Sequence, residues 1–297
     1  MNRFGKIAYC IMVIPSIFVM ILGYVLDIDI KFWWMIAYCA FVVFFLVFLK
    51  NIIQMKKDRP DLGIMEHIRL RKELHRKNAA LLKTDGPEEL ASCILARREL
   101  VEQATGADKV IYTMNLAERL FANGELDEAA WFLDSVASNV KGSLVKLVYW
   151  NNRIAIEMIR QNEEEAEKML PNIFENSKRV TGGKKTRKQL DLIYMRASMW
   201  QAVIEKRYEE ALLLLDEWKK RLDDVASSQD NMQIARQYFL MEKLNVYLKM
   251  NKPVEALEVE KELRKENLYP LIAWWLGQQE PGNMFPSEIF YENGMEK

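Results

Sequence analysis

The histidines and one cysteine are the residues of this chain best suited to metal binding or covalent catalysis, and their spacing favours neither. His67 and His75 are the two histidines of the sequence, and a separation of eight residues places them about 80° apart around a helix. No third ligand follows at a spacing typical of a zinc site. Cys93 has no histidine close to it in the sequence to act as its base. We therefore expect no metal, no cofactor and no nucleophilic catalysis.

Two further patterns could carry chemistry. Adjacent carboxylates occur in residues 163–165 and 223–224, but neighbours on a helix point in different directions, which is more typical of a solvated face than of an acid/base pair. Residues 180–186 resemble part of a phosphate-binding loop, yet Lys185 stands where Ser or Thr should follow Gly-Lys. We expect a solvated basic loop and predict that the protein is not an enzyme. An enzyme would need carboxylates that converge across a helical concavity.

Two apolar runs dominate the N-terminal part of the chain. Residues 7–26 and 32–49 contain no charged side chain, and at about 1.5 Å per helical residue each run approaches the roughly 30 Å hydrocarbon core of a bilayer. Residues 27–31 between them are too few for a domain, so we predict a two-helix hairpin in a membrane anchor of residues 1–57. Basic residues flank its two outer ends, which predicts that both termini and the rest of the chain are cytoplasmic.

The apolar runs have two alternative interpretations. A cleaved signal peptide would also begin with basic residues, but the first run is long for its apolar part, and residues 23–25 do not form a small-x-small cleavage site. A hairpin buried in a soluble core would show one apolar stripe on each helix, whereas these runs are apolar all round. The sequence therefore favours the membrane hairpin.

Residues 58–86 form a second, basic segment, in which residues 63–83 predict a helix. A cluster of basic side chains could attract anionic lipid headgroups; its members are Arg69, Arg71, Lys72, Arg76 and Lys77. The alternative is a solvated helix face. Residues 1–60 carry a formal charge of +4 and the remainder −4, so an acidic body argues against nucleic-acid binding.

Residues 87–276 read as an all-α body made of helical hairpins, followed by a tail of residues 277–297. The sharpest hairpin lies in residues 111–139, where Gly124 in the turn predicts a left-handed helix cap. Small residues at Ala117 and Ala129 allow its two helices to pack closely. Residues 268–276 are apolar and predict a helix that caps the last hairpin.

The hairpin pattern resembles the tetratricopeptide repeat family, whose repeat is about 34 residues long. The matching positions are Leu116, Ala117, Leu120, Gly124, Ala129 and Leu133. Similar turns precede Ala166, Ala211 and Ala256, and the four anchoring alanines, counted from Ala129, lie 37, 45 and 45 residues apart. Because these intervals exceed the family's period, a degenerate helical solenoid outside the strict family stays open.

The resemblance implies a groove lined by the first helix of each hairpin and open to a peptide or protein. Its predicted lining is Met114, Glu118, Phe121, Arg196, Trp200, Met241 and Asn245. We therefore expect a membrane-anchored adaptor that presents a helical-repeat groove to a protein partner. The alternative is a regulatory or structural subunit that contacts a larger membrane complex through the hairpin.

Overall fold

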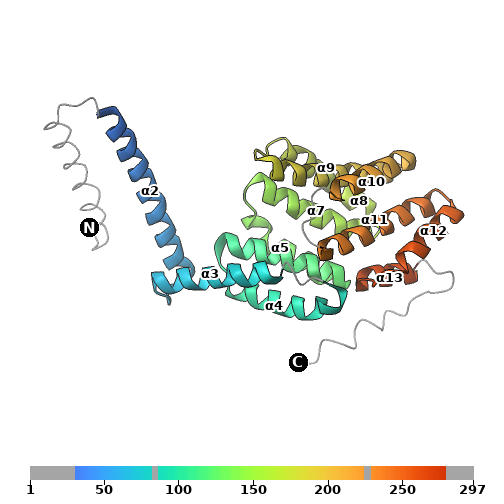
Figure 1. Ribbon diagram of the computed structural model, residues 1–297, viewed down its shortest axis with the longest axis horizontal. Coiled ribbons are helices and arrows are strands. Elements are labelled where there is room, and N and C mark those ends of the chain that lie inside the picture. The colour runs from blue at the N-terminus through green and yellow to red at the C-terminus, as the bar shows by residue number, and fades with distance from the viewer. Residues whose placement is uncertain (1–30, 82–85, 224–228, 279–297) are drawn as a thin grey trace. The chain divides into compact units, whose positions relative to one another are not determined.

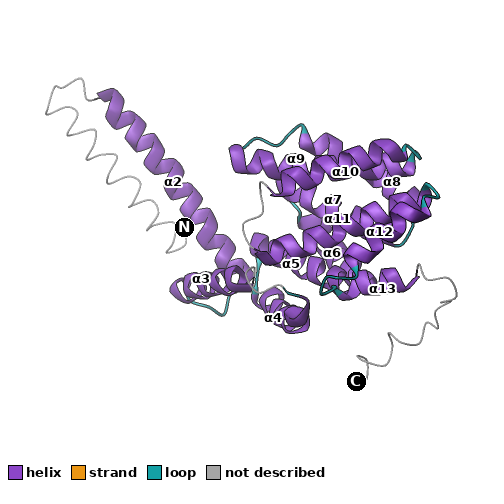
Figure 2. Cartoon of the chain, turned by 45° about the vertical axis from the view of Figure 1, so that its right-hand side comes forward, coloured by secondary structure: helices purple, strands orange, loops and turns teal. Residues whose placement is uncertain are grey.

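The computed structural model describes residues 31–81, 86–223 and 229–278, and every regular element among them is a helix (Figures 1 and 2). This confirms the predicted all-α class. The chain divides into two compact units, Met1–Lys72 and Glu73–Lys297. The division falls inside a helix of the segment that the sequence assigns to a linker, so that segment contributes residues to both units.

The first unit contains α2 (Lys31–Asp58) and the beginning of α3 (Ile64–Leu81). The second apolar run lies within α2, and the first run, residues 7–26, lies outside the described residues. Large apolar side chains on several sides of α2 are exposed, among them Phe44 at 69% and Val43 at 60%. In the part of the chain that the structure describes, no helix combines the length and apolarity that identify a membrane span. The membrane hairpin therefore stays a prediction.

The second unit is built from paired helices. The rest of α3 is followed by η1 (Pro87–Glu89), α4 (Leu90–Gln103), α5 (Gly106–Asn123), α6 (Leu126–Val136), η2 (Ala137–Asn139), α7 (Ser143–Ile159), α8 (Glu163–Ser177), α9 (Lys184–Ile204), α10 (Tyr208–Asp223), α11 (Gln229–Lys249), α12 (Pro253–Leu263) and α13 (Pro270–Gln278). Extensive contacts join α5 to α6, α7 to α8, α9 to α10 and α11 to α12. Four successive hairpins result.

The four hairpin turns share one backbone conformation. Each contains a residue with φ between 54° and 89°, and these residues are Gly124, Gln161, Lys206 and Asn251. The amide that follows each of them donates to the carbonyl five residues earlier, as in Glu125 N to Leu120 O at 2.9 Å and Lys252 N to Tyr247 O at 3.0 Å. This bond satisfies a carbonyl at the end of the first helix. Three turns thus use a non-glycine residue where a left-handed conformation normally favours glycine.

The four anchoring alanines occupy the same place after these turns. The amide of each donates to the carbonyl four residues earlier, and each is at most 3% exposed; they are Ala129, Ala166, Ala211 and Ala256. A larger side chain there would separate the two helices of its hairpin, because protein interiors are close-packed. Each alanine therefore keeps the same place after its turn, although the turns themselves are unevenly spaced in the sequence.

Helices from the end of the body pack against its first hairpin. Helix α13 packs against both α5 and α11, and the Phe121 ring of α5 lies 5.7 Å from the Tyr238 ring of α11. Lys249 of α11 also pairs with Glu163 of α8 at 2.6 Å. The predicted capping helix therefore covers the start of the body as well as its last hairpin, and the first helices surround a central space.

Candidate functional site

A cavity of about 330 Å³ lies between the helices of the second unit. Its lining comes from α5, α6, α7, α9, α10 and α11. Each of the four hairpins contributes to it, but α8 and α12, the second helices of two hairpins, do not. Small residues leave this space unfilled, since Ala117, Ala155 and Ala235 lie in its wall. Its polar lining consists of Glu118, Arg119, Asn151, Asn152, Arg196 and Tyr238. We take this central cavity as the candidate site.

Arg196 lies in the wall of the central cavity, surrounded by aromatic rings. Its guanidinium carbon is 4.6 Å from the ring centroid of Trp200, 6.0 Å from that of Trp218 and 5.8 Å from that of Tyr238. Such cation–π contacts offset part of the cost of burying the charge. Burial nevertheless lowers the pKa of Arg196, although the charges of Glu242, Tyr238 and Glu118 oppose this effect.

Trp200 and Glu242 form a buried pair next to Arg196. Trp200 is 0% exposed, and its indole Nε1 donates to Glu242 Oε1 at 3.1 Å. Burial raises the pKa of Glu242, while the positive charge of Arg196 and the bond from Trp200 act in the opposite direction. The indole therefore positions the carboxyl and supports the Arg196 side chain from its buried side.

Among the polar atoms of the cavity lining, Tyr238 Oη and Asn151 Oδ1 are buried and have no hydrogen-bond partner among the described residues. Burial raises the pKa of Tyr238 above its ordinary value, so its hydroxyl remains a neutral donor at physiological pH. The Asn151 amide nitrogen donates to Asn152 Oδ1 at 3.3 Å, which leaves the Asn151 oxygen as an acceptor. Buried polar atoms normally find partners, and the described residues supply none for these two atoms.

The structure divides the predicted groove residues among three places. Glu118, Phe121 and Arg196 line the central cavity. Met241 and Asn245 line a second cavity of about 20 Å³. Met114 and Trp200 are buried and line neither of these cavities. Partner binding by any of the seven stays a prediction.

Sequence reasoning missed Tyr238, Trp218, Asn151 and Asn152, which line the same central cavity. Tyr238, Asn151 and Asn152 lie on first helices, where the groove was expected, so their positions gave a signal. Trp218 lies on a second helix and gave none. No pattern in the sequence indicates that α11 approaches α5, and that approach is what brings Tyr238 opposite Phe121.

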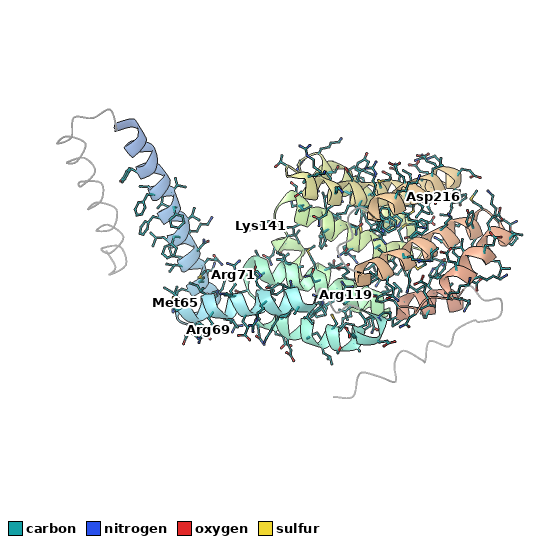
Figure 3. All side chains as sticks on the ribbon, in the orientation of Figure 1. Met65, Arg69, Arg71, Arg119, Lys141 and Asp216 are labelled. Atoms are coloured by element: carbon teal, nitrogen blue, oxygen red, sulfur yellow. The ribbon has the colours of Figure 1, made fainter. Side chains whose placement is uncertain are left out.

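The five predicted lipid-contacting residues are all exposed on α3, and Figure 3 labels Arg69 and Arg71 among them. Lys77 forms an i,i+4 ion pair with Glu73 at 3.1 Å. Because the division between the units falls after Lys72, Arg69, Arg71 and Lys72 belong to the first unit, and the other two belong to the second. Lipid contact stays a prediction.

The described residues offer no metal site, and known proteins offer no match to the chain. Among the described residues, no group of three or more His, Cys, Asp or Glu side chains is arranged to hold a metal ion. In comparisons with known proteins, the chain matches no family model, no curated protein and no solved structure. The central cavity and the exposed apolar face of α2 are therefore the features that bear on function.

Proposed function

We propose that this protein is a membrane-anchored adaptor whose helical-repeat body receives part of a protein partner in the central cavity. The observation that carries the proposal is the set of polar groups left unsatisfied there, Tyr238 Oη and Asn151 Oδ1, beside the Arg196 guanidinium. A cavity of about 330 Å³ lies at the small end of the range for ligand sites. It fits a side chain or chain end better than a whole peptide. The tetratricopeptide resemblance agrees with this role.

The proposed anchor is the hairpin of residues 7–26 and 32–49. The exposed apolar side chains of α2, such as Phe41, Phe44 and Val47, support this part of the proposal, because contiguous exposed apolar surface is costly in water. By the distribution of Lys and Arg around the hairpin, both termini and the body face the cytoplasm. The basic cluster of α3 would then lie close to anionic headgroups.

The exposed face of α2 also favours the second candidate, a subunit of a larger membrane complex. A helix that is apolar on several sides can pack against other membrane helices as well as against lipid. The two functions differ in where a partner protein touches the chain: the central cavity for the adaptor and α2 for the subunit.

In-cell photo-crosslinking distinguishes these functions. A photoreactive residue is placed at Glu118, which is exposed and lines the central cavity, at Val43 on α2, and at Leu213, a control that is 71% exposed on α10. We expect one discrete protein to be captured from Glu118 and not from Leu213. Protein capture confined to Val43 would favour the complex subunit, and crosslinks from Glu118 only to the chain itself would contradict the adaptor.

A further inference from the structure

Arg196 has donors without acceptors. A guanidinium carries five N–H donors and no acceptor, and within the described residues the contacts of this side chain are three aromatic rings and longer-range charges. Aromatic faces attract a cation but leave its N–H groups without the directed hydrogen bonds that a carboxylate or phosphate supplies. An anionic acceptor in the central cavity would supply these directed hydrogen bonds to Arg196.

The surrounding charges indicate a single negative charge on that partner. Arg119 adds a second positive charge to the lining of the central cavity, while the charges of Glu118 and Glu242 act on Arg196 without forming an ion pair with it. A phosphate dianion would be repelled by these two carboxyl groups more strongly than a carboxylate would. The planar fork of a guanidinium also matches the two oxygens of a carboxylate.

Tyr238 Oη and Asn151 Oδ1 indicate which other groups the ligand carries. Tyr238 Oη is a hydroxyl donor, and its ring lies 5.8 Å from the Arg196 guanidinium carbon, so one carboxylate could bind to both groups. Asn151 Oδ1 accepts, so it needs an N–H donor from the ligand. An acidic amino-acid unit supplies both groups, a carboxylate and a nearby amide N–H.

We propose that the central cavity binds one carboxylate group, held by Arg196 and Tyr238, with an adjacent amide N–H held by Asn151. This inference rests on the proposed adaptor function in one respect, namely that the carboxylate belongs to a partner polypeptide. The carboxylate can come from an acidic side chain, from a chain terminus or from a free small acid, and these three sources share the same recognition chemistry.

The test is calorimetric titration of the full chain in lipid nanodiscs with capped amino acids. N-acetyl-glutamate N-methylamide is compared with its neutral glutamine analogue, which has the same shape. We expect the glutamate to bind at least about tenfold more tightly, as charge-assisted hydrogen bonds predict. N-acetyl-alanine then represents a chain terminus, glutarate a free acid, and inorganic phosphate the competing anion.

Matched variants assign the binding to the cavity. R196Q should remove at least about tenfold of the affinity for capped glutamate, and Y238F, which loses one neutral hydrogen bond, about fivefold. R196K keeps the charge and loses the fork, so it should lie between R196Q and the unchanged protein. The control is R236Q. Arg236 lies on the same helix as Tyr238, and its side chain is exposed and pairs with Glu262 at 3.0 Å. The R236Q variant should bind capped glutamate as tightly as the unchanged protein does. Circular dichroism establishes that each variant is folded.

Three results would overturn the carboxylate site: equal binding of the glutamate and glutamine analogues, unchanged binding by folded R196Q together with Y238F, or tighter binding of phosphate. Tightest binding of glutarate would support the carboxylate site and contradict its assignment to a polypeptide. Crosslinking from Glu118 separates the two proposals, because a partner still captured by R196Q would leave the adaptor standing while the carboxylate site fails.

Discussion

Two arginines of this body, Arg97 in the core and the partly buried Arg196, have very different surroundings. Arg97, at the junction of α3, α4 and α5, is 1% exposed, and its guanidinium donates to Asn78 Oδ1 at 3.2 Å and to the Leu81 carbonyl at 3.1 Å. Its Nε also lies 3.3 Å from Cys93 Sγ. Arg196, in the wall of the central cavity, contacts aromatic rings and makes no comparable bonds within the described residues.

The comparison distinguishes polar side chains that hold helices together from polar side chains that a ligand could bind. A buried polar network that is fully bonded fixes one arrangement of its helices, whereas a partly bonded one costs stability unless something else binds to it. Asn78 illustrates the first case, because it accepts from both Arg97 and Asn115 and so joins α3 to α4 and α5. The lining of the central cavity illustrates the second.

The largest effect is expected at the structural arginine. Arg97→Ala removes its hydrogen bonds and leaves a cavity, so it should lower the free energy of unfolding by about 3 kcal/mol. Urea denaturation of the full chain in nanodiscs, followed by circular dichroism, measures this change. Arg236→Ala, which removes an exposed arginine, is the control and should have little effect. A loss below about 1 kcal/mol for Arg97→Ala would show that the network is dispensable.

Glu242, which accepts from the Trp200 indole and lines the second cavity, predicts a pH dependence of stability. Burial raises its folded-state pKa above the ordinary value of 4.5, so the folded protein binds this proton more tightly than the unfolded chain does. Stability should therefore be highest below pH 4.5 with respect to this group, and should fall as the pH rises from there towards the folded-state pKa.

Glu242→Gln tests this sign, because an amide still accepts from the Trp200 indole and has no proton to lose. Thermal unfolding midpoints measured between pH 4 and pH 8 should fall less steeply for the variant than for the unchanged protein. Glu167→Gln, at an exposed carboxylate of α8, is the control. Parallel pH profiles for Glu242→Gln and the unchanged protein would contradict a raised pKa.

A smaller effect is expected where a tyrosine hydroxyl is bonded. Tyr112 Oη and His75 Nδ1 lie 3.0 Å apart and join α5 to α3, and Tyr112 itself is buried. Tyr112→Phe should therefore lower the free energy of unfolding by about 1 kcal/mol, the typical net value of one hydrogen bond. Urea denaturation detects a change of this size, and an unchanged midpoint would indicate that the bond contributes nothing.

Local features of this body could be predicted from sequence, and distant ones could not. The turn at Gly124 and the anchoring Ala129 follow from nearby residues, because a left-handed cap and a close helix contact are local requirements. The central cavity depends on α11 and α13 meeting α5, contacts between residues more than a hundred positions apart. Trp200 was expected in the groove and is buried, since the helical period identifies an inward face without saying what covers it.

The smallest effect on stability is expected at Tyr238, whose hydroxyl contrasts with the bonded hydroxyl of Tyr112. Tyr238 Oη is buried without a hydrogen-bond partner among the described residues, so Tyr238→Phe removes an unsatisfied polar atom and keeps the ring that contacts Phe121 and Arg196. Burying an unpaired hydroxyl costs free energy, and the variant should therefore unfold at the same urea concentration as the unchanged protein or at a slightly higher one.

The two tyrosine variants differ from their parent by the same atom, so the contrast between them isolates the role of the hydroxyl. If Tyr238→Phe destabilises the protein as much as Tyr112→Phe does, the Tyr238 hydroxyl is a structural group, and the central cavity loses the donor that distinguishes it from the rest of the interior. If Tyr238→Phe leaves stability intact and weakens binding of capped glutamate, the unsatisfied hydroxyl is kept for the ligand.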